Sequence, residues 1–454
     1  MKRVFPFTLG VLVLLVLVGA VVAYEQAARV TAVFPADGAA VATGSVEIRI
    51  TFSHPLTVQD VQKRVRFSPN VGGKWRVEGK TAVFTPNMPW RGGQTVTVEV
   101  APPRGIANLP LGAVRRWQFH IAGTRLAYIS PSVGIGNIFT IDPQTGKIAM
   151  LTHSNRVLDF APGFGGRYVY FSQQNFQHGS DIWRIDRLQS GEKSLKRLLV
   201  CGDQQCTSPT PDPTGTYLAY LRNDGFQQGT RVHVFNLNTG QDAALSSENG
   251  TSILPKWSSQ GQLAYYDEGR RGYVIWQPDK GEIRFLANDT GEADAWSPDG
   301  HALLMVAMFL EGGGSEQSPA DAPYLSAHLW LYRLSPTLRR IDLTRDPNLE
   351  DGTPSFSPDG SWIAFGRKYL DPQRWTLGRQ FWLIKPDGSD ARQITNEPNY
   401  NHLDFAWRPD SQAVAYQRTN MSLLTEPPEI WLYDMKTGES RLLVKDGVMP
   451  RWLP

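Results

Sequence analysis

The motif Ser-Pro-Asp-Gly recurs along this chain, and an internal repeat constrains the fold more than any other feature of a sequence. Its clearest copy runs from Pro354 to Gly360 and is followed by the apolar segment Trp362-Ile363-Ala364-Phe365. A second copy runs from Ala295 to Gly300, and a third begins at Trp407. Ser, Pro and Gly suit the first, second and fourth positions of a type I turn, so the motif predicts a tight turn between two strands.

The spacing of the repeats predicts how many there are. The turn positions are Gly123, Gly166, Gly215, Gly261, Gly300, Gly360 and Ser411, which lie 43, 49, 46, 39, 60 and 51 residues apart. Four short strands in about 40 to 50 residues is the period of a β-propeller blade. We therefore expect a seven-bladed β-propeller over residues 123–454. An aromatic residue comes two positions before the Pro in copies such as those of Trp296 and Phe356, and Trp257 has the matching place in a copy without that Pro. These aromatic residues are expected to pack between neighbouring sheets.

The first and last repeats are incomplete in complementary ways. The first copy, which begins at Leu126, lacks the opening Pro-x-aromatic element, whereas Pro450-Arg451-Trp452 supplies that element with no continuation. We expect the C-terminal strand to complete the first blade, which would close the ring without leaving an unpaired strand edge.

These repeats resemble those of TolB-type propellers, which are related to WD-repeat proteins, over about residues 123–454. The resemblance implies a propeller fold. TolB propellers have six blades and follow a different N-terminal domain, whereas this chain has seven repeats. The resemblance therefore does not imply a role in the Tol system. Some TolB-like propellers act on polysaccharides as lyases or glycosidases with a His or carboxylate site in the central funnel, so an enzyme is the alternative function.

Residues 25–122 predict a separate small β-domain. Apolar and polar residues alternate over 46–52 and 95–100, which is the period of half-buried strands, and turn residues lie between such segments. This pattern favours an immunoglobulin-like β-sandwich. Phe34-Pro35-Ala36-Asp37-Gly38 and Trp117-Gln118-Phe119 resemble the bacterial Ig-like domains of S-layer and other cell-surface proteins. The resemblance implies a spacer or adhesive module and no catalytic residue.

Residues 1–24 predict a targeting segment. Lys2 and Arg3 precede an apolar run from Val4 to Ala23, which is long enough to span a bilayer as a transmembrane helix. The positive-inside rule then places the rest of the chain outside the cytoplasm, which gives a single-pass protein of a bacterial cell membrane. A cleaved signal peptide is the alternative, because Val21-Val22-Ala23 resembles a cleavage site. Both readings export the remainder of the chain.

The two cysteines fit an exported protein. Cys201 and Cys206 are separated by four residues, which allows a small disulfide loop in an oxidising compartment. Two free thiols are the alternative to this disulfide. Zinc coordination is disfavoured, because there is no second cysteine pair and no nearby histidine to complete a tetrahedral site.

Charge and motifs exclude several functions. The 46 basic and 43 acidic residues leave a net charge of +3, which is too small to favour a nucleic-acid partner. The sequence has no Gly-x-Ser-x-Gly elbow, no His-Glu-x-x-His motif and no phosphate-binding loop. We therefore expect no metal site, no cofactor and no enzymatic activity.

The long insertions between the second and third strands of the repeats are the best candidates for a binding site, because loops carry function on rigid scaffolds. They lie at 309–327, 368–380 and 419–429, with shorter ones at 173–180 and 223–230, and equivalent loops emerge on one face of a propeller. Arginine and aromatic side chains suit protein or glycan recognition, and those expected on this face are Arg222, Tyr324, Arg367, Tyr369, Arg374, Trp375 and Arg418. The sequence thus predicts a binding or scaffold protein whose partner is an envelope protein or cell-surface glycan. Alternatively, the recurring arginines pair with a neighbouring blade.

Overall fold

The computed structural model describes residues 27–454, except 42–46, 88–89, 91, 106–108, 190–193, 224, 226–228, 246–249, 293 and 312–323. The predicted transmembrane helix or signal peptide lies outside the described residues. Within them, no helix combines the length and the apolar character that crossing a bilayer requires. The chain divides into two compact units between Thr124 and Arg125, and each is all-β apart from short helical segments.

The first unit is a β-sandwich of two four-stranded sheets. The first sheet consists of β1 (Val30–Phe34), β3 (Ile48–Phe52), β6 (Thr81–Pro86) and β5 (Gly73–Glu78). The second consists of β2 (Ala40–Val41), β8 (Arg115–Ile121), β7 (Thr95–Val100) and β4 (Val65–Ser68). Alternate residues of β3 and β8 are buried, as the sequence pattern predicts for strands with one face on a core. Ile50, Val98 and Trp117 belong to this core.

A short helix in this unit was not predicted from the sequence. Helix α2 (Val58–Arg64) begins after Thr57, whose hydroxyl accepts a hydrogen bond from the backbone N–H of Asp60 at 3.2 Å. Threonine is a favoured N-cap residue. Val61 is the buried residue of the helix and packs into the sandwich core.

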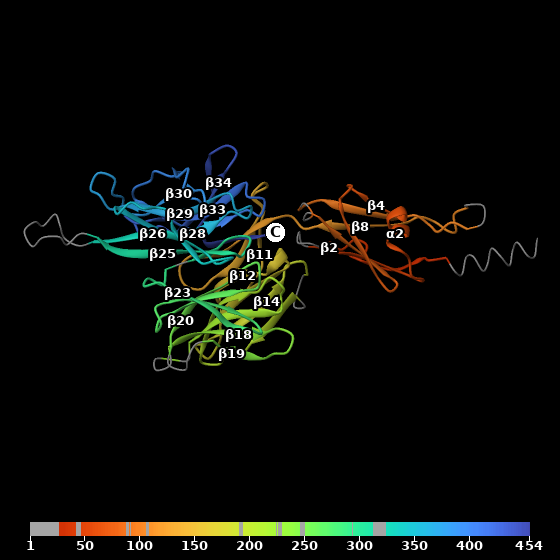
Figure 1. Ribbon diagram of the computed structural model, residues 1–454, viewed down its shortest axis with the longest axis horizontal. Coiled ribbons are helices and arrows are strands. Elements are labelled where there is room, and N and C mark those ends of the chain that lie inside the picture. The colour runs from red at the N-terminus through yellow and green to blue at the C-terminus, as the bar shows by residue number, and fades with distance from the viewer. Residues whose placement is uncertain are drawn as a thin grey trace, which may run out of the picture. The chain divides into compact units, whose positions relative to one another are not determined.

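The strands of the second unit form seven antiparallel four-stranded blades (Figure 1). Single parallel residue pairs, Ser180 with Gln205 and Ala327 with Glu350, join two pairs of neighbouring blades into eight-stranded sheets. Blade 1 consists of β36 (Val448–Leu453), β9 (Arg125–Ser130), β10 (Asn137–Ile141) and β11 (Ile148–Met150), and blade 2 of β12 (Val157–Pro162), β13 (Tyr168–Gln174), β14 (Ser180–Asp186) and β15 (Leu195–Leu199). Blade 3 consists of β16 (Gln205–Pro211), β17 (Tyr217–Asn223), β18 (Thr230–Asn236) and β19 (Asp242–Ala244), and blade 4 of β20 (Ser252–Trp257), β21 (Leu263–Asp267), β22 (Gly272–Gln277) and β23 (Gly281–Ala287). Blade 5 consists of β24 (Ala295–Trp296), β25 (Ala302–Glu311), β26 (Tyr324–Arg333) and β27 (Arg339–Asp342). Blade 6 consists of β28 (Leu349–Phe356), β29 (Ile363–Tyr369), β30 (Gln380–Ile384) and β31 (Arg392–Gln393). Blade 7 consists of β32 (Tyr400–Trp407), β33 (Ala413–Asn420), β34 (Glu429–Asp434) and β35 (Ser440–Lys445). A short 3₁₀ turn, η2 (Phe164–Gly166), lies between β12 and β13.

The innermost strand of each blade contacts the innermost strand of the next, and the series β12, β16, β20, β24, β28, β32 and β36 returns to β12. The C-terminal strand β36 pairs antiparallel with β9, with Leu453 opposite Arg125. This pairing is the ring closure expected from the two incomplete repeats. The architecture is therefore a closed circular array of blades.

The predicted interblade aromatic residues also make a repeated hydrogen bond. Four tryptophans on inner strands donate their indole N–H to a backbone carbonyl of the preceding blade at 2.9–3.0 Å, namely Trp257 to Thr210, Trp296 to Lys256, Trp407 to Ser355 and Trp452 to Ala406. A buried indole N–H needs an acceptor. The same side chains therefore fill the space between sheets and fix their register.

The inner strands share a backbone irregularity that the sequence did not reveal. Ser208, Leu254, Thr353, Asp404 and Met449 have positive φ angles between 49° and 57°. Each lies where its strand's pairing register shifts. A bulge at this position bends the inner strand.

Candidate functional site

One end of the propeller carries the long insertions, and we call it the loop face. Among the described residues, it comprises the segments between second and third strands, the strand ends that lead into them, and the linkers from each fourth strand to the next blade. Strands alternate in direction, so these segments come to the same end. Backbone hydrogen bonds join them: the N–H of Leu377 donates to Pro398 and that of Met421 donates to Asn399, at 2.9 and 2.8 Å.

Exposed apolar side chains concentrate on the loop face. The large hydrophobic residues with at least 36% of their surface exposed there are Val133, Ile135, Phe176, Val200, Met308, Phe309, Leu310, Leu325, Trp375, Leu377, Met421, Leu423 and Leu424. At the opposite end, the segments between first and second and between third and fourth strands carry only Phe164 and Leu338 among the described residues, and the outermost strands carry Ile148, Met150, Leu195 and Ile283. The exposed apolar side chains of this unit are therefore distributed unequally between its two ends.

The blade-6 insertion presents three of the predicted binding residues. The Arg374 guanidinium lies 3.8 Å from the Tyr369 ring centroid, and its Nε donates to the Asp371 carboxylate at 2.7 Å. This pairing lowers the pKa of Asp371. Trp375 is 51% exposed, and the Lys368 ammonium lies 4.8 Å from its ring centroid. The loop therefore holds an exposed indole beside a structured arginine.

Arg367 is placed differently. Its Nε and Nη2 atoms donate to the two carboxylate oxygens of Asp351 at 2.7 and 2.8 Å. The two residues lie opposite each other on β29 and β28, and both are buried. The Arg367 guanidinium also lies 5.0 Å from the ring centroids of Phe365 and Trp382. Arg367 holds the blade together and leaves little surface for a partner.

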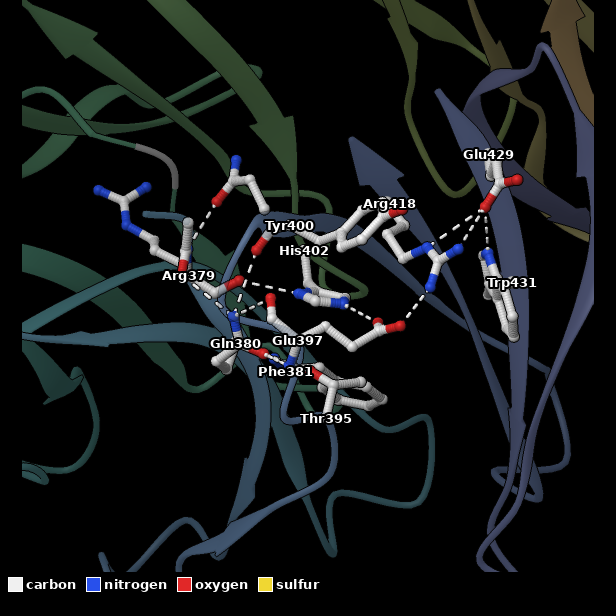
Figure 2. A network of polar contacts seen from close by, with 12 residues as sticks. Arg379, Gln380, Phe381, Thr395, Glu397, Tyr400, His402, Arg418, Glu429 and Trp431 are labelled. Carbon is white, nitrogen blue, oxygen red and sulfur yellow. Dashed lines mark hydrogen bonds and ion pairs between the residues drawn. The ribbon is translucent and has the colours of Figure 1, made fainter. Parts of the chain in front are cut away.

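Arg418 joins a polar network between blades 6 and 7 (Figure 2). Its guanidinium pairs with Glu397 from the linker and with Glu429 from β34, the latter at 2.7 Å. The Tyr400 and Trp431 ring centroids each lie 4.2 Å from the guanidinium. The arginine thus connects the start of β32 to β34, and its side chain is 12% exposed. Glu397 lies in the linker that follows the preceding blade. This ion pair agrees with the alternative that the recurring arginines pair with a neighbouring blade.

His402 and Glu397 complete the network. The imidazole Nε2 lies 3.0 Å from Glu397 Oε2, and Nδ1 lies 2.9 Å from the backbone carbonyl oxygen of Arg379 (Figure 2). The hydrogen bond from His402 and the charge of Arg418 lower the pKa of Glu397. Gln380 fastens the same linker, because its side-chain oxygen accepts from the Glu397 N–H at 2.7 Å.

The remaining predicted residues lie on other blades. Arg222 is the penultimate residue of β17, and its Nη1 lies 3.9 Å from Asp242 Oδ2. Tyr324 begins β26 and pairs with Glu311 across the hairpin; its side chain is not among the described ones. Arg222 and Tyr324 are thus not placed in the Arg418 network or in the blade-6 insertion.

The structure forms the disulfide between Cys201 and Cys206, in the linker between blades 2 and 3. Cys206 is fully buried beneath the loop face. As for metal ligands, the described part of the chain contains no group of three or more His, Cys, Asp or Glu side chains that could hold an ion.

Sequence reasoning missed Glu397, His402 and Glu429. Glu397 and His402 flank the beginning of an inner strand, and such a carboxylate–imidazole pair is the signal that could have drawn attention to them. Glu429 follows Pro427-Pro428 at the end of an insertion. Only the strand pairing shows that it meets Arg418, which lies directly opposite on β33.

Comparison with known proteins gives relatives for parts of the chain. A curated relative, the uncharacterized peptidase YuxL of Bacillus subtilis (strain 168), is 23% identical over 211 residues, which are 38% of this chain and 31% of YuxL. The chain thus matches about a third of the length of that relative.

Similar solved structures have low sequence identity. TolB from Acinetobacter baumannii is 10% identical, with a TM-score of 0.43 and coverage of 80% of each chain. The propeller domain of the Trilobed protease from Pyrococcus furiosus is 11% identical, with a TM-score of 0.46, covering 63% of this chain and 82% of that one. An oligogalacturonate lyase from Vibrio parahaemolyticus is 17% identical, with a TM-score of 0.41 and coverage of 63% and 73%.

The family model described as "Bacterial Ig-like domain" matches residues 25–120. The chain therefore contains a bacterial Ig-like domain, and its structural neighbours are TolB-like and other β-propellers.

Proposed function

We propose that this protein is an exported, membrane-associated binding or scaffold protein that captures a protein partner on the loop face of its propeller. The observation that carries the proposal is the concentration of exposed apolar side chains on that face. The disulfide supports export, because such bonds persist in oxidising compartments. The Ig-like domain serves as a spacer.

The chemistry of the surface favours a protein over a glycan. Blades 6 and 7 expose Trp375, Leu377, Met421 and Leu424. Leucine and methionine add apolar area without the hydrogen bonds that sugars require, and an exposed tryptophan is the residue type most often dominant at protein interfaces. The partner would present an apolar segment to these two loops.

Site-specific cross-linking in cells tests this proposal. The photoreactive residue p-benzoylphenylalanine is placed at Trp375 or Leu424 of the full chain, and at Phe164 on the opposite face as a control. We expect a discrete protein adduct from the first two positions and none from the third. The purified adduct partner should then bind wild-type protein and lose at least tenfold in affinity for a Trp375→Ala, Leu424→Ser variant. Adducts independent of position, or glycan-only adducts, would contradict a protein partner.

The alternative function is an enzyme acting on polysaccharides. Asp294, which precedes the inner strand β24, favours it: both carboxylate oxygens lack a hydrogen-bond partner, and burial raises its pKa. The Lys256 ammonium lies 3.5 Å away. A carboxyl with a raised pKa can act as a general acid. Release of reducing or unsaturated sugar ends by the full chain, lost in Asp294→Asn, would establish this alternative.

A further inference from the structure

Two buried histidines on the loop face have hydrogen-bond acceptors at both ring nitrogens. His402 is fully buried and faces the Arg379 carbonyl and the Glu397 carboxylate, at 2.9 and 3.0 Å (Figure 2). A carbonyl and a carboxylate can only accept, so both imidazole nitrogens must carry a proton to satisfy them. The lowered pKa of Glu397 keeps that carboxyl ionised. The geometry therefore suits the imidazolium form of His402.

His328 on blade 5 repeats this arrangement. It is 6% exposed; its Nδ1 lies 3.2 Å from Asp342 Oδ2, and its Nε2 lies 3.0 Å from the backbone carbonyl oxygen of Asp346. His233 on blade 3 gives an internal comparison. Its Nδ1 lies 3.0 Å from Asp242 Oδ2, but its buried Nε2 has no hydrogen-bond partner. His233 can satisfy its single acceptor with one ring proton, whereas His328 and His402 each need two ring protons to satisfy two acceptors.

The charged and titratable groups around His402 are two carboxylates, one arginine and one tyrosine. Arg418 lies opposite it on β33, and the guanidinium is paired with Glu397 and Glu429. The Tyr416 ring lies 5.7 Å from the imidazole; burial raises the pKa of Tyr416 to about 12, so its hydroxyl stays neutral. Two carboxylates therefore face one arginine and one histidine.

Acidic groups also surround His328. Asp342 comes from β27, Asp351 from β28 interacts electrostatically with the imidazole, and Arg367 is bonded to Asp351. The Phe309 ring from β25 covers the imidazole at 5.2 Å between centroids. Little water reaches either histidine, so a lost proton cannot be replaced by a solvent hydrogen bond.

Both histidines fasten the linkers that support the candidate binding loops. His328 holds the linker at Asp346, and the Asn348 carbonyl of that linker accepts from the N–H of Leu370 at 2.9 Å. His402 holds the linker at Glu397, whose next residues Pro398 and Asn399 accept from Leu377 and Met421. Each histidine therefore hydrogen-bonds to a linker that in turn accepts a backbone hydrogen bond from a candidate binding loop.

We propose that His328 and His402 form a pH-sensitive device that orders the linkers 343–348 and 394–400 when both imidazoles are protonated and loosens them when they are neutral. The inference rests on the proposed function, because ordered linkers would make the protein bind its partner more tightly at mildly acidic pH. Histidine charge changes between about pH 5 and 8. Neutralisation leaves a ring lone pair directed at an acceptor, which favours local opening of the linker.

Hydrogen exchange of the full-length wild-type protein tests the device without any partner. Exchange is measured at pH 5.5 and 8.0, with labelling times corrected for the intrinsic rate. We expect protection in 343–348 and 394–400 to fall at least tenfold more than in the inner strands when the pH rises. In the His328→Gln, His402→Gln double variant, the two linkers should exchange equally fast at both pH values. A His233→Gln variant should behave as wild type.

A second measurement holds even where the double variant does not fold. Nitrogen-15 spectra of labelled histidine in the wild-type protein report how many ring protons each imidazole carries. At pH 6 we expect His328 and His402 to be doubly protonated and His233 singly protonated. Neutral His328 and His402 at that pH, or linker protection that is independent of pH, would overturn the proposal. Because neither readout uses a partner, failure here is distinguishable from failure of the cross-linking experiment.

Discussion

The indole N–H of Trp452 donates to the backbone carbonyl oxygen of Ala406 at 2.9 Å, which links the C-terminal strand of blade 1 to the inner strand of blade 7. Trp452 is 7% exposed and packs with Leu126 and Tyr128 of the same blade. Trp452 therefore contributes both to the β36–β9 pairing that completes blade 1 and to the contact that joins blade 7 to blade 1.

Weakening this closure should destabilise the whole propeller. We expect Trp452→Ala to lower the free energy of unfolding by about 3 kcal/mol, since it removes a large buried side chain. Trp452→Phe keeps most of the buried area and should cost about 1 kcal/mol for the lost hydrogen bond. Deletion of residues 450–454 should lower the melting temperature further. Denaturant unfolding measures these changes, with Trp375→Ala as the exposed control; an unchanged melt in the deletion would contradict the closure.

The buried Arg367–Asp351 pair should be structural. We expect Arg367→Met to lower the free energy of unfolding by about 3 kcal/mol, because it leaves the Asp351 carboxylate buried without its partner. The double variant Arg367→Met, Asp351→Leu should recover most of this loss. Arg374→Met removes an exposed pair and should leave the free energy of unfolding almost unchanged. Equal effects of Arg367→Met and Arg374→Met in denaturant unfolding would argue against this assignment.

Acid should weaken the linker between blades 6 and 7. The pKa of Glu397 is lowered from its ordinary value of 4.5, first by the hydrogen bond from His402. A carboxyl with a lowered folded-state pKa contributes stability that is complete above the unfolded pKa and is lost as the pH falls through the folded one. We expect protection of 394–400 to decline below about pH 4.5, measured by hydrogen exchange. Glu397→Gln should remove this decline, while a persistent decline would assign it to another group.

The disulfide should stabilise the linker between blades 2 and 3. The loop from Cys201 to Cys206 is short, so chain entropy predicts a contribution of about 2 kcal/mol. We expect a Cys201→Ser, Cys206→Ser variant to lose this amount in denaturant unfolding. Treatment with reductant should reproduce the loss in the wild type and leave the variant unchanged. A wild type insensitive to reductant after complete thiol release would count against a stabilising role.

The propeller could be predicted from the sequence because each repeat contains a turn that is formed by residues close together in the chain. Ser357-Pro358-Asp359-Gly360 forms its turn from its own side chains: the Ser357 hydroxyl donates to Asp359 and accepts from the Trp362 N–H. The spacing of such turns gives the number of blades, and Trp452 without a following strand predicts the closure. Helix α2 was not predicted because it is only seven residues long and buries a single residue, Val61.

The candidate site depended on tertiary structure. Arg222, Arg367 and Arg418 have equivalent positions in the sequence repeat, yet Arg367 is buried against Asp351 whereas Arg418 bridges a linker and a strand. The sequence by itself determined the all-β class, the blade repeat and the segments that carry insertions, because these follow from turn chemistry and strand periodicity. Only the folded ring decided which side chains meet across blades, because the burial and pairing of a charged group depend on residues far away in the chain.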